Sequence, residues 1–99
     1  MFFCDLYSEV DAPTDLVVTD VCTDAVSLCW NGSASLYKYQ YRELSDQGEW
    51  FSSLELVNDT CANVTGLSQG HQYEFRVIAV EDGKESDPSE SVNATTSKS

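Results

Sequence analysis

Apolar and polar residues alternate with a period of two along most of the chain. In residues 71–80, HQYEFRVIAV, apolar side chains occupy every second position from Tyr73 to Ala79. A period of two places neighbouring side chains on opposite faces of an extended strand, whereas a helix needs apolar residues three and four positions apart. No window of the sequence sustains the helical spacing, so the pattern predicts strands with one buried and one solvated face.

Seven short strands are expected, with turn residues between them. They cover residues 15–21, 25–30, 37–43, 49–56, 60–67, 71–80 and 90–96. Short strands punctuated by turns every eight to twelve positions are typical of a sandwich of two antiparallel sheets with their apolar faces together. The predicted fold class is all-β, a seven-stranded antiparallel β-sandwich of the immunoglobulin-like kind.

The aromatic residues are expected to form the core of this sandwich. Trp30 ends the second predicted strand, Tyr41 lies in the third, and Tyr73 and Phe75 lie in the sixth. Burying one such side chain stabilises the fold by roughly 1.5–3 kcal/mol, so core packing is favoured over an aromatic platform for a carbohydrate or peptide. The Tyr73 hydroxyl is also expected to hydrogen-bond to a backbone carbonyl around residues 67–69, as in a tyrosine corner.

The order of these residues resembles that of the fibronectin type III family. The matching segments are residues 12–21, Trp30, Tyr41-Arg42-Glu43, Trp50, the run from Gly66-Leu67 through Tyr73 to Val80, and the last loop with Gly83, Ser86, Pro88 and Ser89. The resemblance covers residues 12–96, which leaves 1–11 as a linker or extension and 97–99 as a tail. It implies Greek-key connections, sheets of three and four strands, and a spacer or recognition role without catalysis. Asn31-Gly32-Ser33 after Trp30 and the four cysteines depart from the usual family pattern.

Charge and length narrow the choice of partners. The 99 residues suit one domain, and 17 acidic against five basic residues give a net charge of −12. Such a surface repels phosphate backbones and anionic lipid heads, so neither nucleic acid nor direct membrane insertion is expected. A protein ligand or neighbouring modules of the same chain are the expected partners. Residues 1–4, MFFC, are too short for a secretory signal, so we expect one module of a longer protein.

The sequence contains no catalytic or metal-binding motif. His71 is the single histidine, its glutamine neighbours supply no nucleophile, and there is neither a Gly-x-Ser-x-Gly elbow nor a glycine-rich phosphate loop. The acidic run from Glu81 to Asp87 could hold calcium only weakly and is interpreted as a solvated loop. The chain is therefore predicted not to be an enzyme and to bind no cofactor or metal.

All four asparagines begin a glycosylation triplet, Asn-x-Ser or Asn-x-Thr. They are Asn31, Asn58, Asn63 and Asn93. Because serine and threonine fill about one position in five, four triplets from four asparagines have odds of roughly two in a thousand by accident. Asn63 stands between Ala62 and Val64 and is expected to point to solvent. The pattern favours a secreted or cell-surface ectodomain.

Four cysteines allow three complete pairings: Cys4, Cys22, Cys29 and Cys61. The resemblance implies that Leu28 faces Val64, which puts Cys61 one diagonal step from Cys29, about 7–8 Å away. That distance is at the limit of what a disulfide spans. Cys29–Cys61 is the candidate bridge, Cys4 could reach the same end, and Cys22 is expected to be solitary. Four free thiols in a reducing compartment are the alternative.

The main hypothesis is an extracellular, non-catalytic module for cell adhesion, receptor-type protein recognition or spacing within a multidomain protein. The alternatives are an accessory domain of a secreted enzyme, an intracellular muscle-type module and an engineered binding scaffold. Scaffold binders concentrate tyrosine in loops, whereas here the tyrosines mostly lie on strands.

Three contact surfaces are considered. Two are the loops after Trp30 and Val80, expected at opposite ends of the sandwich; the second loop contains the candidate binding residues Gly83, Lys84, Glu85, Ser86 and Asp87. The third is the strand face with Lys38, Gln40 and Arg42, for which a solvated surface is the favoured interpretation.

Overall fold

The computed structural model describes residues 10–44, 49–53 and 55–98, and these form strands and connections without a helix. No helix in this part of the chain could therefore cross a membrane. The strands are β1 (Thr14–Val21), β2 (Val26–Asn31), β3 (Leu36–Glu43), β4 (Phe51–Ser52), β5 (Cys61–Val64), β6 (Gln72–Glu81), β7 (Lys84–Glu85) and β8 (Val92–Thr95). The predicted all-β sandwich is confirmed.

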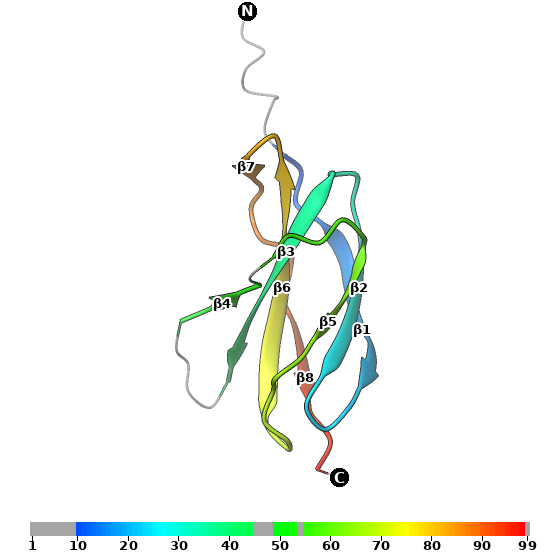
Figure 1. Cartoon of the computed structure of the whole chain (residues 1–99), viewed down its shortest axis with the longest axis vertical. Helices are drawn as coiled ribbons and strands as arrows, with labels where there is room; N and C mark the ends of the chain where they lie inside the picture. Colours follow the sequence, from blue (N-terminus) through cyan, green and yellow to red (C-terminus); the bar gives the residue numbers. More distant parts are fainter. Residues whose placement is uncertain (1–9, 45–48, 54, 99) are drawn as a thin grey trace, which may run out of the picture.

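The strands form two antiparallel sheets that pack face to face (Figure 1). One sheet has the order β1-β2-β5. In the other, β4, β3 and β6 follow one another, and β7 and β8 both pair with β6. The expected sheet of four strands thus contains five, because Lys84 and Glu85, which were predicted to lie in a loop, form the additional short strand β7.

The gap between β7 and β8, which both pair with β6, has a local cause. Pro88 has no backbone N–H and cannot donate to β6. Serines on either side of it make the hydrogen bonds to β6 instead. Ser86 N donates to Ala79 O over 2.9 Å, and Ser89 N donates to Val77 O over 2.8 Å. Their hydroxyls accept hydrogen bonds from the backbone N–H groups of the same two β6 residues. The segment therefore follows β6 without a continuous ladder.

The predicted strand at 49–56 is much shorter than expected. In the described part of this segment only Phe51 and Ser52 pair as a strand with β3. The chain returns to β3 at Val57, whose N–H and C=O exchange hydrogen bonds with Tyr37. From there it crosses to the opposite sheet and enters β5.

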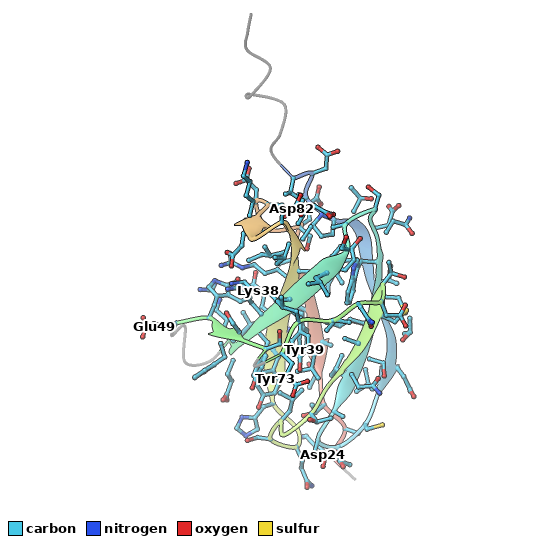
Figure 2. The ribbon with its side chains drawn as sticks, turned by 45° about the horizontal axis from the view of Figure 1, so that its top comes forward. Asp24, Lys38, Tyr39, Glu49, Tyr73 and Asp82 are labelled. Carbon is cyan, nitrogen blue, oxygen red and sulfur yellow. A yellow bond between two sulfur atoms is a disulfide. The ribbon has the colours of Figure 1, made fainter. Side chains whose placement is uncertain are left out.

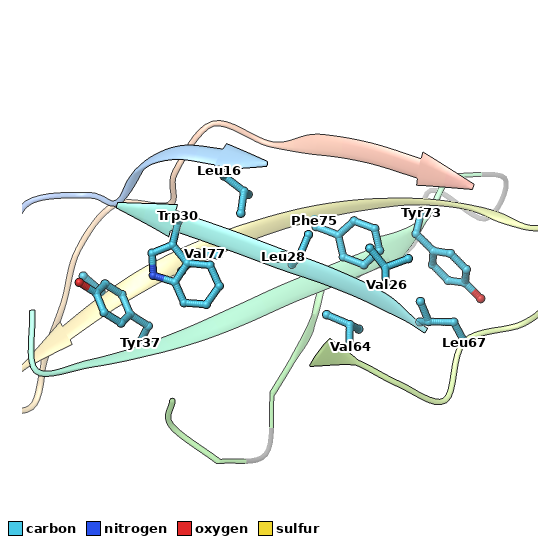
Figure 3. Packing of buried hydrophobic residues seen from close by; sticks show 11 residues of the cluster. Leu16, Val26, Leu28, Trp30, Tyr37, Val64, Leu67, Tyr73, Phe75 and Val77 are labelled. Atoms are coloured by element: carbon cyan, nitrogen blue, oxygen red, sulfur yellow. The ribbon is translucent and has the colours of Figure 1, made fainter. Parts of the chain in front are cut away.

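The core lies between the two sheets, and the alternation along β2 and β6 determines which side chains fill it (Figure 3). Trp30 is 3% exposed and its ring meets Tyr37 edge-on, with ring centroids 5.5 Å apart. Leu28 and Phe75 are fully buried, and Tyr41 is half-buried with its ring 6.4 Å from that of Phe75. The predicted stripe of β6 thus supplies the centre of the core.

The register between β2 and β5 differs from the one implied by the family. Leu28 pairs with Ala62 rather than with Val64, and Val64 pairs with Val26. A shift of two residues leaves every side chain on its expected face, because strand side chains alternate with a period of two. It does change the outer pairs, and Cys29 now lies directly opposite Cys61.

Tyr73 forms a tyrosine corner, although with a different partner than expected. Its hydroxyl accepts a hydrogen bond of 2.8 Å from the backbone N–H of Ser68, within the expected segment 67–69. The expectation of a carbonyl partner was wrong. Leu67 beside it is buried, and its own N–H donates to Asp24 O over 3.0 Å. The two contacts attach the turn before β6 to the rest of the sandwich.

Candidate functional site

The loops after Trp30 and Val80 lie at the same end of the sandwich, so the expectation of opposite ends was wrong. Ser35 donates to the Glu81 carboxylate twice, from its N–H over 2.9 Å and from its hydroxyl over 2.7 Å. These bonds, the hydroxyl first, hold the pKa of Glu81 below its usual value. The cause of the placement is topological. β3 and β6 are antiparallel neighbours, so the start of β3 lies beside the end of β6.

The candidate binding loop at residues 83–87 is a tight hairpin rather than an open loop. Asp82 and Gly83 have φ angles of 52° and 78°. Two successive positive φ values are those of a type I′ turn, which the Asp-Gly sequence favours. The turn joins Glu81 to Lys84, its pairing partner, and the chain continues into β7. Only the two turn residues are left outside the ladder, which limits the adaptable surface at this position.

The outer face of the five-stranded sheet gathers basic side chains in an acidic protein. We call Lys38, Gln40, Arg42, Trp50 and Arg76 the basic face. It holds three of the five lysines and arginines of the chain. They come together because Arg76 on β6 pairs with Gln40 at the centre of β3, and side chains of paired residues share a face of the sheet. Figure 2 labels Lys38 on this sheet.

Ion pairs and hydrogen bonds order the basic face. Lys38 Nζ lies 2.7 Å from a Glu85 carboxylate oxygen, and Arg42 Nε lies 2.9 Å from Glu74 Oε1. Glu74 also accepts a hydrogen bond from the Ser91 hydroxyl, and this bond is the main reason why its pKa is lowered, with Arg42 contributing less. The strand face that was expected to be solvated is therefore half-buried, and ion pairs and hydrogen bonds connect its side chains.

Trp50 lies against both arginines of the basic face. The guanidinium carbon of Arg76 is 4.0 Å from the Trp50 ring centroid, and that of Arg42 is 4.7 Å away. Each contact has the geometry of a cation–π interaction, worth about 0.5–1 kcal/mol at an exposed site. Burial against this cluster lowers the pKa of Arg76. In the sequence, Trp50 was recognised only as part of the family pattern. The available signal was one arginine on each of two predicted strands, Arg42 and Arg76.

The structure joins Cys29 and Cys61 by a disulfide with a Cα–Cα distance of 4.0 Å. The expected diagonal separation of 7–8 Å was wrong because the strands pair in the shifted register. The bridge lies on the outer face of the three-stranded sheet, where Cys61 is exposed. Cys22 has a free, exposed thiol. Cys4 lies outside the described residues.

All four glycosylation triplets present exposed asparagines. Asn58 lies in the connection to β5. Asn31 ends β2 and donates from Nδ2 to Asp15 Oδ2 over 2.8 Å. Asn63 on β5 accepts a hydrogen bond of 2.7 Å from the Ser27 hydroxyl at Oδ1. Asn93 on β8 lies opposite Glu74, so it belongs to the other sheet. The acceptors are therefore distributed over both outer faces.

The titratable groups form no recognisable catalytic or metal centre in the described part of the chain. Its histidine, cysteine and carboxylate side chains include no group of three that could hold a metal ion. His71 contacts the carboxylate of Glu43 through Nδ1.

The model of the family "Fibronectin type III domain" matches residues 11–95. The chain belongs to this family. The match lies within one residue of the expected 12–96 at each end, and the division into linker, domain and tail stays a prediction. Receptor-type tyrosine-protein phosphatase F of Mus musculus is 38% identical over 88 residues, which are 85% of this chain and 5% of that protein.

Two further similarities are to titin-like proteins. Titin homolog of Caenorhabditis elegans is 38% identical over 90 residues, or 85% of this fibronectin type III chain and 0% of the relative. The crystal structure of domains A168–A170 from titin matches with a TM-score of 0.82 at 26% identity, over 90% of this chain and 32% of that one. The chain thus spans a small part of each relative, and modules like it occur both in a receptor-type phosphatase and in titin-like proteins.

Proposed function

We propose that the chain is an extracellular, non-catalytic fibronectin type III module of a secreted or cell-surface protein. It takes part in adhesion or receptor-type protein recognition, or spaces neighbouring modules. The observation that carries the proposal is the Cys29–Cys61 disulfide on the outer surface of the sandwich. Disulfides persist in oxidising compartments, and Cys61 is exposed to reductants in a cytosolic setting.

Two further observations support the extracellular assignment. The four triplet asparagines are exposed, three on the two sheets and Asn58 in the connection to β5, as glycosylation requires. A relative named as a receptor-type phosphatase is among the most similar proteins. We propose N-linked sugars at Asn31, Asn58, Asn63 and Asn93.

The second candidate is an intracellular, muscle-type module, which the similarity to the titin homolog favours. An accessory domain of a secreted enzyme would share the disulfide and the sugars, and a catalytic domain elsewhere in the full-length protein would identify it. An engineered scaffold is the least favoured, because the candidate binding loop is a two-residue hairpin turn.

The basic face is the contact surface that we propose for recognition. It concentrates positive charge in a chain of net charge −12, and Trp50 adds a flat aromatic surface between two guanidinium groups. Aromatic and arginine side chains dominate the energy of many protein interfaces. The complementary partner is an acidic protein surface. In a titration at low salt, a glutamate-rich peptide should shift the amide signals of β3 and β6; shifts confined to other strands would contradict this assignment.

The compartment is tested by secreting the protein from a eukaryotic host. Thiols are counted in the denatured protein before and after reduction, and the intact mass is measured. We expect at least two additional thiols after reduction, and added hexosamine in the mass spectrum. Equal thiol counts together with an unmodified mass would reject the extracellular proposal in favour of the intracellular one.

A further inference from the structure

A groove opens beside the free edge of β5. Its volume is about 440 Å³, within the range of about 300–1,000 Å³ typical of small-ligand pockets. Its lining is mixed: Tyr39, Leu56, Val57 and Ala62 contribute apolar surface, and Ser53, Glu55 and Asn63 contribute polar groups. The groove thus joins the edge of one sheet to the segment that crosses over from the other. Tyr39 is labelled in Figure 2.

The side chain of Asn63 is oriented by its neighbour in the sheet. Ser27 lies on β2, directly opposite Asn63, and its hydroxyl donates to Asn63 Oδ1 over 2.7 Å. Since the oxygen of the amide faces β2, the nitrogen on the other side of the amide carbon faces away from β2. In the order β1-β2-β5 that direction is the free edge of the sheet, where the groove lies. Nδ2 is the atom to which an N-linked sugar is attached.

Part of the groove wall is apolar surface that is exposed to solvent. Leu56 is 47% exposed, among the largest exposures of a big apolar side chain in the described residues. Burial raises the pKa of the neighbouring Tyr39 hydroxyl, with a smaller contribution from Tyr41. An attached group with one apolar face would cover surface that is costly to leave in water.

We propose that Asn63 carries an N-linked glycan whose first N-acetylglucosamine lies in this groove against Leu56 and Tyr39. The assignment rests on the proposed extracellular function. Attachment forms a bond between Nδ2 and C1 of the sugar and breaks the bond from C1 to an oxygen of a lipid-linked pyrophosphate donor. The lipid pyrophosphate leaves, and the amide nitrogen loses one proton. Thr65 completes the triplet that the transferase of the secretory pathway recognises.

Asn31 and Asn93 lack this combination. Nδ2 of Asn31 is engaged by Asp15, and Asn93 lies on the outer face of the five-stranded sheet, opposite Glu74. Sugars attached to these two residues are therefore expected to extend into solvent. Thr95, which completes the triplet of Asn93, gives a matched control on β8.

The test uses the protein secreted from a eukaryotic host, with its glycans trimmed enzymatically to one N-acetylglucosamine. We expect nuclear Overhauser contacts from the acetamido methyl of this sugar to the Leu56 methyls and the Tyr39 ring. Thr65→Ala removes the attachment and should lower the melting temperature by roughly 4–8 °C, the shift that about 1 kcal/mol produces in a domain of this size. Thr65→Ser keeps the triplet and should keep both the sugar and the melting temperature.

A second substitution separates groove contact from a general effect of sugar. In a Leu56→Ala background, Thr65→Ala also removes the sugar, but it should lower the melting temperature by less than half as much as it does in the wild-type protein. Thr95→Ala should change the melting temperature by the same small amount in both backgrounds. Two results would overturn the inference and leave the proposed function standing. One is a sugar on Asn63 that makes no contact with the groove. The other is a melting-temperature shift on loss of that sugar that is the same in the Leu56→Ala background as in the wild type. Sugar on other asparagines but not on Asn63 also overturns the inference alone. No sugar at any triplet overturns the inference, and it rejects the proposed function only when the thiol counts before and after reduction are also equal.

Discussion

Removal of the Cys29–Cys61 disulfide should be the most destabilising change that leaves the core intact. The bridge joins residues 32 positions apart on neighbouring strands. In the chain-entropy description, the entropy lost by the unfolded chain is about 2.1 + 1.5R ln n cal/mol/K, which for a loop of this length corresponds to about 3.7 kcal/mol at 25 °C. For a domain of 99 residues this should lower the melting temperature by roughly 15–20 °C.

The assay is urea unfolding of the double variant Cys29→Ala/Cys61→Ala beside the wild-type protein and Cys22→Ala. Two alanines avoid leaving a single reactive thiol, and they remove little apolar surface because the bridge lies on the outer face. The Cys22→Ala control removes the exposed free thiol and should unfold within about 0.5 kcal/mol of wild type, as surface substitutions do. A double variant within about 1 kcal/mol of wild type, with an unchanged dependence on urea, would refute the reasoning.

Three further predictions concern single side chains. Tyr73→Phe should destabilise the fold by about 1–2 kcal/mol in urea unfolding, because Ser68 N–H loses its acceptor; an unchanged midpoint would argue against the tyrosine corner. Trp50→Ala should release both guanidinium groups and cost about 1–2 kcal/mol, whereas Trp50→Phe should retain part of this contribution; equal losses would contradict the cation–π interpretation. The pKa of Glu74 is lower in the folded state, so its stabilising contribution is present above the unfolded value near 4.5 and is lost as the pH falls through the folded value. In Glu74→Gln the free energy of unfolding should therefore fall less steeply as the pH drops below 4.5. An acid transition identical to that of the wild type would exclude this role.

The hydrophobic alternation was sufficient to predict the fold and the core. Trp30, Tyr73 and Phe75 are buried, as predicted, because a period of two leaves only one choice of face for each strand. The same alternation could not determine how far β5 slides along β2. Any shift by two residues buries the same side chains, and only a shift by one would expose them. Leu28 could therefore be assigned to Val64 instead of Ala62 without any conflict in the apolar pattern.

Connections between strands explain the other differences. A short hairpin turn fixes the register of the strands that it joins, as Asp82-Gly83 does for β6 and β7. β2 and β5 have no such turn between them, because β3 and β4 intervene in the chain. The meeting of the loops at Ser35 and Glu81 likewise depends on the pairing of β3 with β6. Long-range pairing of this kind leaves no local trace in the sequence.

One register connects the features on the outer face of the three-stranded sheet. In the observed pairing, Cys29 faces Cys61 and Ser27 faces Asn63. If β5 were shifted by two residues, Asn63 would face Cys29 and Ser27 would face Thr65, so the disulfide would be diagonal and the Ser27 hydroxyl would no longer bind the amide of Asn63. The covalent bridge excludes this alternative, because it holds the Cα atoms of directly opposed residues 4.0 Å apart. The disulfide therefore does more than restrict the unfolded chain: it selects, from two pairings with equivalent cores, the one in which Ser27 binds the amide of Asn63 beside the groove.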